Sequence, residues 1–211
     1  MKKLSLPAIA LAIALTGCAD PTSNIVPDDS LIAHAGEHDG RGGRLSAGTL
    51  AQLAQVRRAT AQFHNIDAAM AAGYTIWSPN PFVPGASCAT SAEGKMGYHL
   101  VNPSLRGSPA NPGAADAVLD PLRPEMLLYE KRRDGKLHLV GVEYLVFKAA
   151  WEREHGPGAA PPQLLGQTVP FSSHTFPPSV NHNVDHYELH LWLWKPHPNG
   201  MFSPWNPSIS C

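Results

Sequence analysis

The chain has 211 residues, with 16 lysines and arginines against 17 aspartates and glutamates, and a formal net charge of −1 when histidine is neutral. This balance excludes the charge pattern of a nucleic-acid-binding protein, because no basic run is longer than Lys131-Arg132-Arg133. A chain of this length can bury one good hydrophobic core, so the sequence predicts a single folded domain.

The first residues predict a leader that is not part of the fold. Lys2 and Lys3 precede an apolar stretch, residues 6–15, which has the length of a signal peptide and is too short to span a membrane. The sequence Leu15-Thr16-Gly17-Cys18 follows at once and resembles the lipobox of bacterial lipoproteins. The resemblance implies that residues 1–17 are removed and that Cys18 is the lipidation site. The alternatives are an uncleaved anchor and an ordinary secretory signal.

The lipobox resemblance also implies a location. Ala19, and not an aspartate, follows Cys18, which favours the outer membrane, facing the periplasm, over retention at the inner membrane. The mature chain would lose Lys2 and Lys3 but no acidic residue, so its net charge would move from −1 to −3. We therefore expect a cell-envelope lipoprotein that is held at the membrane by its lipid anchor.

Residues 18–45 are rich in Pro, Asp, Gly and Ser, a composition typical of a flexible tether. His34 and His38 lie in this stretch, and we expect them to be solvated linker residues rather than metal ligands. The globular domain is then residues 46–211.

The main helical signal runs from Ser46 to Gly73. Leu50, Leu53 and Val56 recur at helical spacing, and Gly73 is a natural helix terminator. Asn65 could cap a second short helix, so we expect a break near residues 64–65.

From Gly73 onward the sequence changes to short apolar runs that are separated by prolines and glycines. The expected strands are 74–77, 97–101, 126–131, 136–147 and 187–195, with a hairpin turn at Asp134-Gly135. Residues 104–124 and 156–180 are expected to be long Pro/Gly-rich loops. One helical region followed by strands predicts an α+β fold, with the helical region packed on a curved antiparallel β-sheet or partial barrel.

Two cysteines remain once Cys18 is lipidated. Because an even number of cysteines in an oxidising compartment favours pairing, we expect a disulfide between Cys88 and Cys211. The alternative is a pair of ligating thiolates, although neither cysteine lies in a typical zinc-binding motif.

The segment from His186 to Trp194 carries the most informative pattern. If it is a strand, side chains alternate between its two faces, so His186, Glu188 and His190 share one face with Trp192 and Trp194. A row of metal-binding groups that continues into large aromatic side chains favours a metal or acid/base site.

Two further residues are candidates for the same site. Glu143 lies within an apolar strand, where burying its carboxylate without a partner would be costly. The alternatives are a place at the edge of the sheet or a pairing with an arginine such as Arg123. His99 lies within another expected strand, where the backbone would fix its direction, although a histidine there could also be an ordinary core residue.

Together these residues predict a divalent metal site with the ligands His99, Glu143, His186, Glu188 and His190. Two histidines and a carboxylate suit iron(II), and a further histidine suits zinc or copper. Tyr98, Trp192 and Trp194 are expected to wall the pocket. The histidine spacing is not that of the helical zinc proteases, and the sequence contains no P-loop, G-x-S-x-G or G-x-G-x-x-G motif.

The segments 97–103, 141–145 and 188–211 are similar to a group of bacterial secreted proteins, a resemblance that implies no activity. Two interpretations of function follow from the residues. The first is a metal-binding lipoprotein that is also a candidate small metalloenzyme acting on a small molecule. The second is a non-catalytic envelope lipoprotein that binds an apolar ligand or a protein partner, with structural histidines.

Overall fold

The computed structural model describes residues 43–76, 88–176 and 180–211. The predicted leader, the lipidation site Cys18 and the tether histidines His34 and His38 lie outside these residues. Within them, no helix is both long enough and apolar enough to cross a membrane.

The predicted helical region is present and breaks where expected. Helix α2 (Ala47–Thr60) is followed by the 3-10 turn η1 (Ala61–His64) and by the short helix α3 (Ile66–Ala71). The Ser46 side chain accepts a hydrogen bond from the backbone N–H of Thr49, and Asn65 caps α3 by accepting from Asp67. Gly73 then ends the region with a positive φ of 92°.

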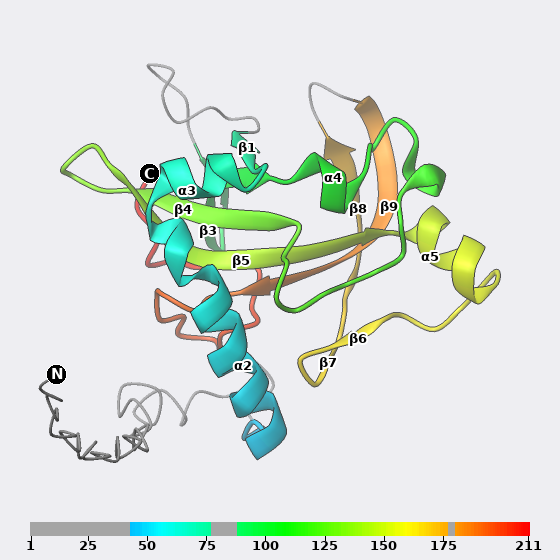
Figure 1. Ribbon diagram of the computed structural model, residues 1–211, viewed down its shortest axis with the longest axis horizontal. Coiled ribbons are helices and arrows are strands. Elements are labelled where there is room, and N and C mark those ends of the chain that lie inside the picture. The colour runs from blue at the N-terminus through cyan, green and yellow to red at the C-terminus, as the bar shows by residue number, and fades with distance from the viewer. Residues whose placement is uncertain (1–42, 77–87, 177–179) are drawn as a thin grey trace, which may run out of the picture.

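The strands form a strongly curled antiparallel half-barrel, which confirms the predicted α+β class with a curved sheet (Figure 1). Six strands follow one another in the spatial order β1-β3-β4-β5-β9-β8, and β2 also pairs with β3. Their bounds are β1 Thr75–Ile76, β2 Ala89–Ser91, β3 Gly94–Val101, β4 Met126–Lys131, β5 Leu137–Phe147, β8 Phe171–Phe176 and β9 Val180–Leu191. The shorter elements are α4 Pro103–Arg106, η2 Pro112–Ala114, α5 Lys148–His155, β6 Gln163–Leu164 and β7 Gln167–Thr168.

The two faces of the sheet bury different side chains. The face covered by α2 and η1 holds the largest apolar cluster, in which Leu53, Val56 and Phe63 pack with the strands. Tyr187, Leu189 and Leu191 of β9 point to this face, as the alternation predicts. The opposite face of β9 therefore carries His186, Glu188 and His190.

The short elements α4, η2, β6 and β7 lie in spans predicted as loops, and three longer elements also differ from the prediction. The last strand begins at Val180 and ends at Leu191, so it does not continue through residue 195. Strand β8 lies inside the span predicted as a loop, because Phe171–Phe176 has a largely exposed, polar middle that lacks the apolar alternation of a core strand. Helix α5 was also not predicted, since it buries only Ala150 and is too short to show a helical period.

The predicted disulfide joins Cys88 to Cys211, with Cα atoms 5.8 Å apart and a sequence separation of 123. It anchors the irregular C-terminal segment, residues 192–211, against β2 and β3. The segment also pairs with β3 directly, through hydrogen bonds in both directions between Lys95 and Asn206. Because both thiols are used in the disulfide, neither is a metal ligand.

Candidate metal centre

The register of the sheet brings His99, Glu143 and His190 together on its second face. Glu143 on β5 lies directly opposite His190 on β9. On the other side of β5, Glu143 lies opposite Met126 on β4, and Met126 in turn lies opposite Val101 on β3. Val101 is two residues from His99 on the same strand. These three side chains therefore come from strands that are far apart in the sequence, and we call them the central cluster.

The central cluster is tightly spaced and buried. Oε2 of Glu143 lies 3.1 Å from Nε2 of His99 and 3.5 Å from Nε2 of His190. The exposed fractions of His99, Glu143 and His190 are 7%, 3% and 2%. The two imidazole rings are almost perpendicular, at 87°, so their nitrogens approach the carboxylate from different directions.

Two polar atoms of the central cluster lack a hydrogen bond in the described part of the chain. Among the described residues, Oε2 of Glu143 and Nε2 of His190 form none. Nε2 of His99 and Oε2 of Glu143 are close enough for a hydrogen bond at 3.1 Å, so the bond is absent because the two groups are poorly aligned. Leaving such groups unmatched in a protein interior costs several kcal/mol for a charged group, and a shared cation would remove that cost.

A second group, which we call the edge cluster, lies at the β8–β9 side of the same face. Oε2 of Glu188 lies 3.2 Å from Nε2 of His186 and 3.5 Å from Nε2 of His174. His186 is fully buried, whereas the His174 side chain is 45% exposed. In each cluster the candidate ligand atoms all lie within 4.8 Å of one another, so each group could hold a metal ion.

Glu188 and His174 of the edge cluster each stabilise the charged form of the other. Burial alone would raise the pKa of Glu188, but hydrogen bonds from His174 and His186 outweigh it and hold that pKa well below its usual range. The hydrogen bond with Glu188 in turn raises the pKa of His174, although burial opposes the shift. Glu188 is therefore a carboxylate at neutral pH.

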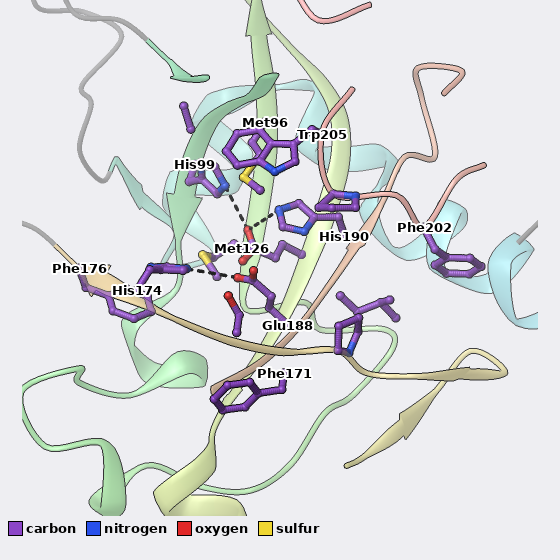
Figure 2. Close-up of a pocket in the computed structure, with 16 residues that line it drawn as sticks. Met96, His99, Met126, Phe171, His174, Phe176, Glu188, His190, Phe202 and Trp205 are labelled. Atoms are coloured by element: carbon purple, nitrogen blue, oxygen red, sulfur yellow. Dashed lines mark ion pairs between the residues drawn. The ribbon is translucent and has the colours of Figure 1, made fainter. Parts of the chain in front are cut away.

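All three residues of the central cluster, and His174 and Glu188 of the edge cluster, line one cavity of about 600 Å³. Figure 2 shows Trp205 beside His99 and His190, and Phe171 on the opposite side, below Glu188. The rest of the wall is largely apolar and includes Met96, Met126, Phe176 and Phe202.

The structure divides the five predicted ligands between two clusters. His99, Glu143 and His190 come together, while His186 and Glu188 belong to the edge cluster with His174. Sequence reasoning missed His174 because it placed this residue in a loop. The available signal was weak, because the four residues between Phe171 and Phe176 are all polar and show no apolar alternation.

The residues predicted to wall the pocket lie elsewhere. Tyr98 points to the α2 side of the sheet, into the main core. Trp194 lies near Arg57 and His64, also on that side. Trp192 stacks behind His190, with ring centroids 6.4 Å apart, and donates a hydrogen bond to the Ser203 carbonyl. It therefore supports a candidate ligand without lining the cavity.

The edge position and the pairing with Arg123 that were alternatives for Glu143 are not realised, although the buried Arg106 attracts Glu143 electrostatically. Glu143 is central in the sheet, and Arg123 forms an exposed ion pair with Asp120 at 2.8 Å. Sequence reasoning missed a second buried carboxyl group, that of Glu125, which accepts a hydrogen bond from the backbone N–H of Leu145 at 3.1 Å. Burial raises the pKa of Glu125 to about 8.

His197 is a buried histidine with a structural role, and it differs from the histidines of the two clusters. Nε2 of His197 lies 2.6 Å from the Trp205 carbonyl, and its Nδ1 accepts from the Asn199 backbone N–H at 2.9 Å. Both ring nitrogens are therefore satisfied by backbone groups, and the ring holds the turn that carries Trp205. The histidines of the two clusters differ, because each directs a nitrogen to a shared carboxylate.

Comparison with known proteins gives no match, either to a family model, to a curated protein or to a solved structure. The proposals below therefore depend on the geometry of this chain.

Proposed function

We propose that this protein binds one divalent transition-metal ion through Nε2 of His99, Oε2 of Glu143 and Nε2 of His190. The observation that carries the proposal is the convergence of these buried atoms without hydrogen bonds for Glu143 and His190. A divalent cation would neutralise the carboxylate and accept the lone pairs of both imidazoles.

The spacing supports this proposal. Metal bonds to histidine nitrogen and carboxylate oxygen are about 2.0 to 2.2 Å long, so two ligand atoms of one ion lie about 3.0 Å apart at a right angle and about 3.4 Å apart in a tetrahedron. The measured separations of 3.1 and 3.5 Å fall close to these values. An oxygen that shares an ion with an imidazole also lies off the axis of its nitrogen, which is the alignment that fails as a hydrogen bond.

The ligand set favours iron(II), zinc or copper over magnesium or calcium, because imidazole suits the transition metals and the hard cations prefer oxygen. Three protein ligands leave coordination positions open. Since all three residues line the cavity, a small molecule there would reach the ion directly. The ion would act on it as a Lewis acid or as an oxygen-activating centre.

A second candidate function is the binding of an apolar molecule without chemistry. The observation that favours it is the wall of the cavity, where Met96, Phe171, Phe202 and Trp205 present apolar surface. Ligand binding to metal-free protein distinguishes the two functions. An apolar ligand that needs no metal would bind equally well to protein stripped of metal.

We also propose that the domain is attached to the cell envelope through a lipid on Cys18, because Leu15-Thr16-Gly17-Cys18 resembles a lipobox. Intact-mass analysis of the native protein tests this proposal. A chain that begins at Cys18 with acyl groups supports it, and a Cys18 without acyl mass contradicts it.

The test of metal binding uses protein purified without a histidine tag and without chelator. Each variant is loaded with iron(II), zinc or copper, and its metal content and affinity are measured. His190→Ala and Glu143→Ala should each lower the affinity of the central site at least about 10- to 100-fold, since even residues around the first ligands have effects of that size. The matched control is His155→Ala, because His155 is exposed and stacks on Trp151 outside both clusters.

Glu143→Gln separates a loss of metal from a loss of fold. An amide is easier to bury than a carboxylate, so the metal-free variant should fold at least as stably as the wild type while it loses the central ion. Wild-type protein without bound metal after loading with all three ions would overturn the proposal.

A further inference from the structure

Hydrogen bonds in the edge cluster show which ring nitrogens of His174 and His186 carry a hydrogen. Nδ1 of His186 lies 2.7 Å from the Val184 carbonyl oxygen, and Nδ1 of His174 lies 3.0 Å from that of Thr175. A carbonyl oxygen can only accept a hydrogen bond, so each Nδ1 carries the hydrogen. In a neutral ring Nε2 then holds a lone pair, and both Nε2 atoms face Oε2 of Glu188.

Nε2 can donate the hydrogen bonds to Glu188 described above only where the ring is doubly protonated. In neutral rings the two lone pairs would repel the carboxylate oxygen unless a cation lies between them. The rings of His174 and His186 are 4.5 Å apart at 82°, so their Nε2 atoms approach that oxygen from different directions. Phe176 packs against both rings, at 4.7 and 5.1 Å, and fixes their orientation. Histidines that bind metal through one nitrogen commonly donate the other N–H to a backbone carbonyl, which is the arrangement of both rings here.

We propose that the edge cluster is a second metal site, which takes a divalent zinc, copper or iron(II) ion through Nε2 of His174, Nε2 of His186 and Oε2 of Glu188. This goes beyond the single ion of the central cluster, and it uses separate ligands because the two clusters share no residue. The ligand set is again two histidines and one carboxylate, which leaves open positions.

The two ions would share the cavity without sharing a ligand. Glu188 and His190 are two residues apart on one face of β9, a separation of about 6.5 to 7 Å along a strand. Ions bridged by one oxygen atom lie about 3.5 to 4 Å apart, so these would be two separate mononuclear sites that face the same molecule. Because His174 is partly exposed and the central ligands are buried, the edge ion should exchange faster.

The experiment counts ions in the full chain, with His34 and His38 changed to alanine so that the tether does not bind metal. Zinc titration followed by elemental analysis should give two ions per chain. His174→Ala should leave one ion, His190→Ala should leave one, and the double variant should leave none. His155→Ala is the control and should keep both. Glu188→Gln should also remove the edge ion, and it leaves the shape of the side chain almost unchanged.

The outcomes separate this inference from the proposed function. If the protein binds one ion that His190→Ala removes and His174→Ala does not, the edge site is overturned and the central site stands. If His174→Ala alone removes a single ion, the edge site stands and the central site is overturned. Nitrogen NMR gives an independent readout: zinc should shift the Nε2 signals of His174 and His186. Signals of two doubly protonated rings that zinc leaves unchanged would show that protons occupy the cluster, and would overturn the inference.

Discussion

The central and edge clusters contain the same groups, two histidines and one glutamate, but the fold builds them in different ways. The central cluster draws one residue from each of β3, β5 and β9, so its geometry depends on the register of the whole sheet. The edge cluster comes from the β8–β9 hairpin alone, and neighbouring backbone carbonyls fix its rings. Damage to the sheet or to its C-terminal cover should therefore affect the central cluster far more than the edge cluster.

The largest expected effect concerns the Cys88–Cys211 disulfide. It closes a loop across most of the described domain, and loop-closure entropy predicts a stabilisation of about 4 to 5 kcal/mol for a separation of this size. Cys211→Ser should lower the free energy of unfolding by an amount of that order. It should also release the segment that places Phe202 and Trp205 on the cavity, and so weaken the central site more than the edge site.

Denaturant unfolding of the wild type and of Cys211→Ser, with metal titration of each, measures both effects. Treatment of the wild type with a reductant is the matched control, since it opens the same bond without a substitution. Thiols at Cys88 and Cys211 that react with an alkylating agent in native, oxidised protein would contradict the prediction.

Two glycines of similar conformation test the role of the sheet register. Gly97 and Gly135 have φ angles of +82° and +75°, so alanine at either position is strained by about 1 to 2 kcal/mol. A Cβ at Gly135 meets no atom within 4 Å, whereas one at Gly97 would collide with the Tyr129 carbonyl oxygen on β4. Gly97→Ala should therefore cost about 1 to 3 kcal/mol more than Gly135→Ala.

The collision at Gly97 also bears on the site, because His99 lies two residues further along β3. Gly97→Ala should weaken metal binding at the central cluster and leave the edge cluster unchanged, while Gly135→Ala should leave both unchanged. Thermal unfolding and zinc titration of the two variants provide the comparison. Equal losses of stability would mean that the β3–β4 contact is not tight at Gly97.

The sequence predicted the central cluster better than the edge cluster, for a physical reason. His99, Glu143 and His190 each interrupt an apolar strand, so the conflict between their polarity and their expected burial was visible before the structure. Which of them would meet was not visible, because the register of strands that are distant in sequence depends on contacts along the whole sheet. The prediction therefore joined five residues into one site, whereas the structure places them in two clusters.

The edge cluster was only half visible because β8 does not resemble a core strand. Its middle residues, Ser172 to Thr175, are polar and largely exposed, and the strand forms through pairing with β9 and not through its own apolar pattern. The same limit applies to the pocket wall. Trp192 and Trp194 were assigned to the wall by extending the alternation of β9, but the strand ends at Leu191, and the cavity is covered instead by Trp205 from the tail.

The smallest expected effect concerns Glu125, a buried carboxyl group whose pKa shifts in the opposite direction to that of the partly buried Glu188. The pKa of Glu188 is lowered by its histidines, whereas burial raises that of Glu125, next to the central cluster, from about 4.5 to about 8. The folded state thus keeps a proton on Glu125 that the unfolded state loses above pH 4.5. The stability from this group is fully present below pH 4.5 and falls as the pH rises towards 8, by at most about 1.4 kcal/mol per pH unit.

Between pH 6 and 7 the free energy of unfolding of metal-free wild-type protein should therefore fall by about 1 kcal/mol more than that of Glu125→Gln. The amide oxygen of glutamine can still accept the hydrogen bond from Leu145, so the variant removes the titration and keeps the contact. Urea unfolding of both proteins at the two pH values gives the difference, in which the contributions of histidines common to both proteins cancel. Identical pH slopes would mean that Glu125 is already ionised in the folded protein, and that a positive charge near the central cluster stabilises it.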